Sequence, residues 1–501
     1  MSGDILEGLN ILLSNIWIVP IGVALGMVIG AIPGLTSSNS LAIMLPILFA
    51  LPPETGLVFM VSIYGGAEVG NSFPAILLNI PGTPGAAVTT IEGYPMAKNG
   101  QASRALGISI MASTLGAIFG AIFSITSAPV LAKVALKFSS VEICIIVLFG
   151  IMVIAQMSSG GIYKALFAGF FGLLLATTGT DPIFGQVRGT FGSLYLMDEL
   201  PVVPALVGLL ALSELFIVIE NNHENEQQLN VGQNIVGIKG ILSGFKDVIK
   251  RPVEWIRASL IGLIIGAIPG AGGSVASFVS YQQSASFAPP KIREQFGKGR
   301  PEGLIAAEAS NNAVVGGSLI PLLTLGLPGS GSMAVLMVVM GYHGLYLGPR
   351  LFSLNGDIAY AVLWSQFMAA FMMILIGTVL AYVSYRVAFI NINVIVPIVA
   401  IFALIGGFAP RQFVFDMVLV IIFGVLGYFM KKYKYPPIAM LLGIILGPLF
   451  EANLFRGLKM GLGSPLIFFN RPLSILLWVL LIFTMVAPVI IRHYSNRQNS
   501  I

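Results

Sequence analysis

Long runs without charge constrain this chain more than any other feature. No Asp, Glu, Lys or Arg occurs at 8–53, 105–132 or 309–349. A helix that crosses the hydrocarbon core of a bilayer needs about 20 apolar residues, so each of these runs is long enough for one or two crossings. Of the 501 residues only 9% are charged, against roughly 25% in soluble domains. The sequence therefore predicts an integral membrane protein.

Further apolar runs bring the expected number of crossings or half-crossings to about twelve. The lengths suit helices rather than the alternating strands of about ten residues that build a membrane barrel. The expected fold class is therefore all-α and polytopic. The further runs lie at 143–163, 165–180, 200–219, 258–290, 358–385, 387–410, 417–430, 435–450 and 472–491.

Basic residues lie in the short polar stretches between the apolar runs and act as markers of topology. The positive-inside rule places the densest group, in the longest polar stretch, in the cytoplasm. That group comprises Lys239, Lys246, Lys250, Arg251 and Arg257. A second cytoplasmic turn is expected at Lys431, Lys432 and Lys434. The net charge of +5 is spread over loops rather than over one face, so no nucleic-acid partner is indicated.

Two motifs occur twice in the chain, which indicates an internal duplication. GMVIGAIPG at 26–34 recurs as GLIIGAIPG at 262–270. GNSFPAILLNIPG at 70–82 aligns with GSLIPLLTLGLPG at 317–329. The GxxxG spacing that opens the first motif is assigned to close helix packing.

The duplication predicts how the chain is divided. We expect a first transmembrane repeat at 1–220, a polar cytoplasmic linker at 221–254, and a second transmembrane repeat with a C-terminal helix at 255–501. The two repeats are expected to be inverted relative to one another, as in many secondary transporters.

Each copy of each motif ends in Pro-Gly. Proline removes a backbone donor and glycine permits a non-helical turn, so helices should break at Pro33, Pro81, Pro269 and Pro328. At membrane depth the freed N–H and C=O groups must be buried in protein or face a watery cavity. Matching breaks in two repeats point to the binding site of a secondary transporter, with re-entrant hairpins and alternating access.

The same segments resemble the large permease subunit, TctA, of tripartite tricarboxylate transporters. The resemblance is carried by GAIPG at 30–34, by YGGAEVGNSFPAILLNIPGTPGAAVTTIEGYPMAKNGQASRALG at 64–107 and by EASNNAVVGGSLIPLLTLGLPGSGSMAVL at 308–336. It implies a bacterial inner-membrane system with a small membrane subunit (TctB-like) and a periplasmic substrate-binding protein (TctC-like). It also implies cation-coupled import of citrate or a related carboxylate. The stretch NSFPAILLN at 71–79 is less rich in Ser and Thr than in many relatives, which leaves the identity of the carried acid open.

The candidate substrate-binding residues are the small and polar residues at the four breaks. Hydroxyl and amide groups can hydrogen-bond a carboxylate, and helix N-termini offer free N–H groups and partial positive charge to an anion. Single residues of this kind more often join helices by hydrogen bonds, whereas a cluster at the breaks indicates a site. The set comprises Pro33, Gly34, Thr36, Ser37, Asn71, Ser72, Asn79, Pro81, Gly82, Gly270, Gly272, Ser274, Ser318, Thr324, Pro328, Gly329 and Ser330.

Two glutamates inside apolar segments are candidates for coupling to a cation, because charges in such segments are rare and costly. Glu68 precedes the second motif, and Glu308 precedes Asn311 and Asn312 by one helical turn, which places these groups on one face. Together with Asn79 they can hold Na⁺ through oxygen atoms or carry a proton. A glutamate at an exposed helix end is the alternative. Neither motif contains Lys or Arg, so a co-transported cation is expected to balance the substrate's charge.

Other functions fit the sequence less well. GAIPGAGGS at 266–274 lacks the Lys-Ser/Thr of a phosphate-binding loop, and His223, His343 and His493 have no His or Cys nearby in the sequence to form a metal site. An anion channel, and more distantly an intramembrane enzyme, remain as alternatives. A channel would be expected to carry rings of charge or a symmetric filter. No cofactor is expected beyond the Na⁺ or H⁺ coupling ion.

Overall fold

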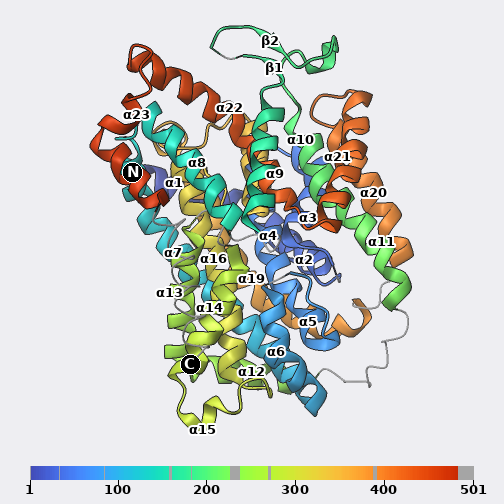
Figure 1. The fold of residues 1–501 in the computed structure, drawn as a ribbon. Coiled ribbons are helices and arrows are strands. Elements are labelled where there is room, and N and C mark those ends of the chain that lie inside the picture. Colours follow the sequence, from blue (N-terminus) through green and yellow to red (C-terminus); the bar gives the residue numbers. More distant parts are fainter. Residues whose placement is uncertain are drawn as a thin grey trace, which may run out of the picture.

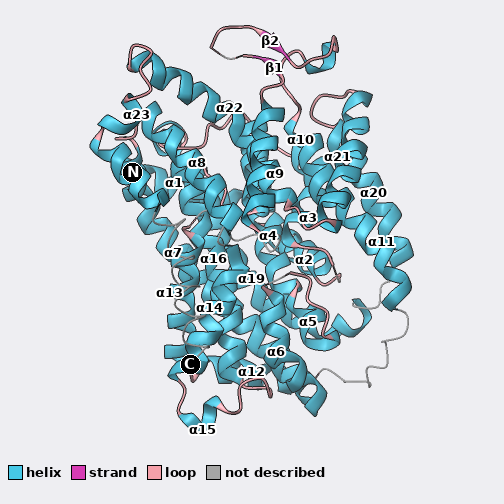
Figure 2. Cartoon of the chain, in the orientation of Figure 1, coloured by secondary structure: helices cyan, strands magenta, loops and turns pink. Residues whose placement is uncertain are grey.

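The computed structural model describes residues 2–32, 34–83, 85–156, 161–181, 183–225, 237–268, 272–387 and 392–482. Helices make up most of this part of the chain, and the elements are traced along the sequence in Figure 1 and by type in Figure 2. Of the candidate site residues, Pro33 and Gly270 lie outside the described residues.

The first half of the chain consists mainly of helices and contains one small β-hairpin. In the hairpin, β1 and β2 are antiparallel, with Gly179 opposite Arg188. The elements are α1 (Ser2–Ser14), α2 (Ile18–Gly30), α3 (Ser37–Ala50), α4 (Pro53–Gly70), α5 (Ser72–Leu78), α6 (Ala86–Met96), η1 (Ala97–Gln101), α7 (Ala102–Ala135), α8 (Ser140–Gln156), α9 (Ile162–Ala176), β1 (Gly179–Thr180), β2 (Val187–Arg188), η2 (Leu194–Leu196), α10 (Val202–Val207), η3 (Gly208–Leu212) and α11 (Ser213–Asn225).

In the second half, helices are the only regular elements among the described residues. Its labelled elements are followed by a further apolar helix at Pro472–Ile482. The elements are α12 (Ile238–Ile249), α13 (Pro252–Gly266), α14 (Gly272–Phe287), α15 (Pro290–Arg293), α16 (Pro301–Leu325), α17 (Gly331–Tyr342), α18 (Leu351–Leu354), α19 (Gly356–Val387), α20 (Ile392–Phe408), α21 (Val414–Lys432), α22 (Pro437–Met460) and α23 (Ile467–Asn470).

Several helices have the length and apolarity of membrane spans. Among the described residues, 5 helical stretches are long enough to cross a bilayer, and the pair α1 and α2, bent by 73°, makes up to 6. Six shorter apolar helices of 10–17 residues accompany them. The prediction of an all-α polytopic membrane protein is confirmed. The full stretches are Ala86–Ala135, Val202–Glu220, Gly356–Tyr382, Val414–Lys432 and Pro437–Met460.

Helices of the two halves pack in matching pairs. α2 packs on α4, and α13, its counterpart by the sequence duplication, packs on α16. Two further contacts connect the halves: α1 packs on α19, and α12, from the predicted linker, packs on α7. The long helices α7 and α19 thus tie the two halves of the chain together. The two-repeat organisation and the inversion of the repeats stay predictions.

Glycines allow the paired helices to touch at their backbones. A Cβ atom built at Gly26 would lie 2.2 Å from the carbonyl oxygen of Ile63, and one at Gly262 would lie 2.1 Å from that of Ser310. No larger residue fits at either position without a shift of the backbone. Close approach through small residues is a common way for helices to associate in a membrane, and this is the packing role predicted for the GxxxG spacing.

The predicted linker contains an amphipathic helix, α12, which packs on α7. Ile241, Gly244 and Val248 are buried, whereas Lys239 and Lys246 are exposed. The spacing of three and four residues between the buried positions places them on one helical face. In Figure 1, α12 and α15 lie at the lower end of the molecule and the β1–β2 hairpin lies at the upper end.

Candidate functional site

The helices are interrupted at the second motif in both halves. α5 ends at Leu78 and α6 begins at Ala86, while α16 ends at Leu325 and α17 begins at Gly331. The residue that ends each first helix adopts a left-handed conformation, with φ of 61° at Asn79 and 71° at Gly326. These positions are opposite one another in the sequence duplication. Asn and Gly are the residues that tolerate this conformation best, so the interruption is built into both copies.

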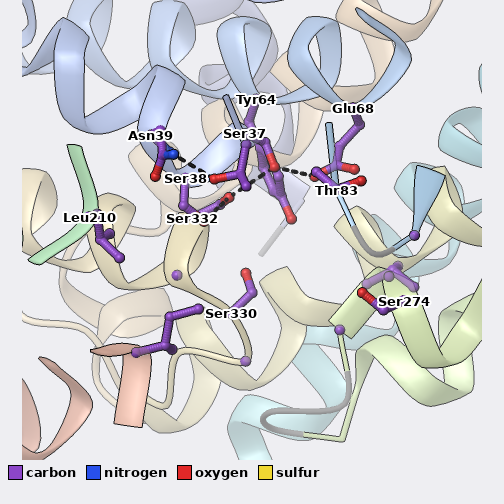
Figure 3. A pocket seen from close by; sticks show the side chains of 18 of the residues that line it. Ser37, Ser38, Asn39, Tyr64, Glu68, Thr83, Leu210, Ser274, Ser330 and Ser332 are labelled. Atoms are coloured by element: carbon purple, nitrogen blue, oxygen red, sulfur yellow. Dashed lines mark hydrogen bonds between the residues drawn. The ribbon is translucent and has the colours of Figure 1, made fainter. Parts of the chain in front are cut away.

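The four helices that begin after the breaks direct their N-terminal turns to one cavity of about 370 Å³. The lining includes residues 36–39 of α3 and the turn before it, Thr83 and Gly85 before α6, residues 272–275 of α14, and residues 329–332 around the start of α17. Figure 3 shows Ser330 and Ser274 on opposite sides of the open space. These segments lie far apart in the sequence, and the tertiary fold brings them together.

The helix N-termini make this cavity suited to an anion. The side-chain oxygens of Thr36 and Ser330 each accept a hydrogen bond from a backbone N–H of the first turn, at 3.3 Å in both cases, and Thr83 does the same for α6 at 3.1 Å. Other N–H groups of the first turn have no partner within a helix. Because these groups and the helix dipoles carry partial positive charge, they favour a carboxylate.

The remaining walls come from longer helices. α4 contributes Tyr64 and Glu68, and α16 contributes Asn311 and Val314. Tyr64 and Asn311 align with one another in the sequence comparison of the two halves, so both halves contribute to the cavity wall. A third wall is formed by η3, α11, α21 and α22, with Leu210, Glu214, Lys431, 436–438 and Leu442.

Of the two candidate glutamates, Glu68 is the one that lines the cavity. Its Oε1 accepts a hydrogen bond from Ser37 Oγ at 2.5 Å, and its Oε2 accepts one from Asn311 Nδ2 at 2.9 Å. Ser332 Oγ in turn donates to Ser37 Oγ at 3.4 Å and lies 3.1 Å from Ser38 Oγ. Ser37, Ser38, Ser332 and Glu68 are drawn near one another in Figure 3. With the bond from Asn311, these contacts join both halves of the chain.

Glu308 lies in a separate, enclosed cluster. Its side chain is 1% exposed, and it accepts hydrogen bonds from Thr89 Oγ1 at 2.5 Å, Ser113 Oγ at 2.8 Å and Ser72 Oγ at 2.9 Å. These donors belong to α6, α7 and α5. Within the described residues, neither Glu308 nor Glu68 forms an ion pair with a basic side chain. The two carboxylates are therefore held by neutral groups only.

Comparison with known proteins identifies the family. The Tripartite tricarboxylate transporter TctA family matches residues 16–442. This chain belongs to the TctA family. A protein of Agrobacterium vitis described as an uncharacterized 52.8 kDa protein in the TAR-I ttuC' 3' region is 32% identical over 459 residues, which cover 91% of this chain and 89% of the relative.

A second Agrobacterium vitis protein, described as uncharacterized and lying in the TAR-II ttuC' 3' region, is 30% identical over 213 residues, which cover 42% of this chain and 87% of the relative. No solved structure matches this chain significantly. Membership makes the chain a subunit of a tripartite tricarboxylate transporter and a multi-pass membrane protein. It also removes the enzyme alternative, because TctA proteins are transporter subunits.

The structure divides the candidate residues of this TctA chain into groups. One group lines the cavity: Thr36, Ser37, Glu68, Gly272, Ser274, Asn311, Gly329 and Ser330. Another is buried beside or near the Glu308 cluster. Asn71 is 1% exposed, and neither of its side-chain polar atoms has a hydrogen-bond partner among the described residues; the same holds for Oδ1 of Asn312. Unpaired buried amide oxygens are costly and are free to accept a cation.

Other candidates have local structural roles. Ser318 Oγ donates to the carbonyl of Val315 at 3.1 Å and Thr324 Oγ1 donates to that of Ile320 at 2.7 Å, both within α16. Asn79 and Pro81 are exposed. Along with Gly34, Gly82 and Pro328, all of these residues lie outside the cavity lining described above.

Sequence reasoning missed two charged residues of the lining. Lys431, expected only as a marker of a cytoplasmic turn, and Glu214 both line the cavity, with Lys431 Nζ 2.5 Å from Glu214 Oε2. Although the motifs contain no basic residue, the folded cavity contains one, Lys431. Glu214 interrupts an otherwise apolar stretch, and by the rule applied to Glu68 this was the signal that could have identified it. Tyr64 carried no such signal.

Proposed function

We propose that this TctA subunit imports a di- or tricarboxylate into a bacterial cell across the inner membrane, coupled to Na⁺ or H⁺. In this proposal it works with a small membrane subunit and receives its substrate from a periplasmic binding protein. The observation that carries the proposal is the convergence of four helix N-terminal turns on one cavity that also holds a carboxylate, Glu68.

The cavity suits the proposed substrate in size and chemistry. A volume of about 370 Å³ lies within the range of roughly 300–1,000 Å³ common for small-molecule sites. Its polar lining consists largely of hydroxyl groups and helix N-termini, which hydrogen-bond carboxylate oxygens. These groups offer partial positive charge to each carboxylate. They avoid the cost of removing a fully charged side chain from water.

Glu68 supplies the reason for cation coupling. A substrate carboxylate in the cavity would lie near the Glu68 carboxylate, and like charges in a region of low dielectric repel strongly. Ser37 and Asn311 are neutral and cannot cancel this charge. A proton on Glu68, or Na⁺ beside it, removes the repulsion. Substrate and cation therefore bind better together than separately, which is the thermodynamic basis of symport.

The Glu308 cluster is proposed as a second cation site. Hard cations prefer oxygen ligands, and Thr89, Ser113 and Ser72 place three hydroxyl oxygens on one buried carboxylate. Glu308 and its three donors are not among the residues that line the cavity, so a cation there would act on the hairpin helices α5 and α6 and on the long helix α7 rather than on the substrate directly.

Transport by the reconstituted system tests this function. The subunit, its small membrane partner and the binding protein are placed in proteoliposomes, and uptake of labelled carboxylates is measured with Na⁺ and pH gradients imposed separately. We expect accumulation against a gradient that requires both the binding protein and one of the cations. Glu68→Gln should abolish accumulation, whereas Glu54→Gln, at the exposed start of the same helix, should not.

Two results would overturn the proposal. Uptake that only equilibrates the carboxylate, without need for the binding protein, would indicate the anion channel. Full accumulation by Glu68→Gln would remove Glu68 from the coupling mechanism.

A further inference from the structure

An ion pair forms part of the cavity wall away from the helix N-termini. Lys431, in the last turn of α21, lies with its Nζ 2.5 Å from Oε2 of Glu214, in the first turn of α11. Both side chains line the cavity, and their exposed fractions are 23% and 18%. No part of the duplicated motifs contributes to this pair.

Lys431 differs in kind from the other anion-binding groups of the cavity. It is the one lysine or arginine in the lining that the structure describes. A helix N-terminus carries only about half an elementary charge, shared over its first turn. An ammonium group is a compact full charge with three donors. A substrate with two or more carboxylates thus finds two different sets of partners, namely the helix ends and Lys431.

A neighbouring ion pair provides an internal contrast. Lys432 Nζ lies 2.7 Å from Glu220 Oε1, and their exposed fractions are 45% and 44%. This pair joins the same two helices, α21 and α11, but is outside the described lining. An exposed pair of this kind contributes little. The Lys431–Glu214 pair borders the space that a substrate would fill. A ligand there can replace Glu214 as the partner of Lys431.

We propose that Lys431 binds a second carboxylate of the substrate and that Glu214 is the carboxylate it releases on binding. This inference rests on the proposed function and adds to it the selection of di- and tricarboxylates over monocarboxylates. In the empty cavity Glu214 neutralises Lys431. A ligand with one carboxylate can be held by the helix ends and leaves the ion pair closed. A ligand with a second carboxylate takes the place of Glu214.

Direct binding to the purified full-length subunit tests the exchange, because the binding protein cannot then filter the ligand. Ligand-dependent shifts of the melting temperature are titrated with succinate and with butyrate, which has the same chain length but one carboxylate. We expect wild-type protein to bind succinate more tightly than butyrate. In Lys431→Gln, succinate affinity should fall about tenfold or more, the range for loss of one member of a charge pair, with little change for butyrate.

Two further variants complete the test. Lys432→Gln is the matched control and should keep the wild-type preference. Glu214→Gln removes the competing carboxylate and should tighten succinate binding several-fold, so it decides the matter if Lys431→Gln is not obtained folded. An unchanged succinate preference in Lys431→Gln, or weaker succinate binding in Glu214→Gln, would overturn the exchange. If no carboxylate shifts the wild-type melting temperature, the proposed function itself fails.

Discussion

The two halves of the molecule share a backbone plan but place their carboxylates differently. The alignment that puts Gly70 opposite Gly317 puts Glu68 opposite Val315 and Glu308 opposite Val61. Glu68 faces the cavity, whereas Glu308 is enclosed among hydroxyl groups of α5, α6 and α7. The aligned motifs thus supply the helix ends that line the cavity, and residues without a charged counterpart in the other half supply its charges.

The largest expected effect tests the shared plan. Gly26→Ala and Gly262→Ala each introduce a methyl group against a backbone carbonyl, at 2.2 Å and 2.1 Å. We expect each variant to lose about 1–3 kcal/mol or more of stability, as overpacking usually does. Gly341→Ala, on a helix surface with nothing within 4 Å of the new methyl, is the control. Thermal unfolding in detergent measures the effect. If only one of the two variants were destabilised, the glycine contacts in the two halves would not be equivalent.

The next effect concerns the difference between the halves. Glu68→Gln should abolish cation-driven uptake, because the charge that links cation to substrate is lost. Glu308→Gln should leave substrate binding intact but raise the cation concentration needed for half-maximal uptake, since Glu308 is not among the residues that line the cavity. The two variants are compared by initial rates over a range of Na⁺ concentrations and pH. Identical responses would show that the two carboxylates act as one site.

A moderate effect separates buried from exposed amides. Asn312→Ala removes a buried oxygen that has no partner among the described residues. We expect this change to raise the cation concentration needed for half-maximal uptake several-fold. Asn79→Ala changes an exposed residue and should leave cation dependence unchanged. Uptake measured over a range of cation concentrations distinguishes the two variants. Equal increases in that cation concentration for both variants would show that Asn79 belongs to the coupling site, as the sequence suggested.

A smaller effect concerns the left-handed residues that end α5 and α16. Gly326→Ala should cost about 1–2 kcal/mol, the usual penalty for a side chain in this conformation. Gly326→Asn should cost less, because Asn occupies the equivalent position, Asn79, with nearly the same φ. The difference between the two melting temperatures is the measurement. A more stable Ala than Asn variant would show that the two breaks are not equivalent.

The smallest effect distinguishes two contacts that connect the halves, α12 on α7 and α1 on α19. α12 is tied to α7 by Asp247, whose carboxylate accepts from Arg104 Nε at 2.6 Å and from Arg251 Nη1 at 3.1 Å. Burial alone would raise the pKa of Asp247, but these hydrogen bonds and charges outweigh it and hold the pKa below its usual range. A lowered pKa in the folded state gives a stabilisation that is present above the unfolded pKa of about 3.9 and is lost as pH falls through the folded value.

Hydrogen exchange of α12 between pH 7 and pH 5 should therefore show no loss of pH-corrected protection. Asp247→Asn should lower protection of α12 slightly at both values, because partly exposed ion pairs contribute only about 0.2–1 kcal/mol. α1 meets α19 through the hydrogen bond from Trp364 Nε1 to the carbonyl of Ile5 at 3.3 Å and should be unaffected. A loss of α12 protection near pH 6 would contradict this assignment.

The sequence alone determined the class of protein and the positions of the breaks. Uncharged runs require a membrane because apolar area cannot remain in water, and this depends on composition along the chain. The interruptions near Pro81 and Pro328 follow from the missing N–H of proline and the backbone freedom of Asn79 and Gly326, which are local properties. The duplicated motifs located these breaks at equivalent positions without any knowledge of packing.

The tertiary structure decided which side chains meet. Lys431 and Glu214 are distant in sequence from the motifs, and only the packing of α21 on α11 brings them to the cavity. Likewise the face that Glu68 or Glu308 presents depends on how α4 and α16 are rotated against neighbours from the other half. Spacing along one helix shows which residues share a face, but not what that face contacts. Asn79 was expected in the site and is instead an exposed residue at the C-terminal end of α5, outside the cavity lining.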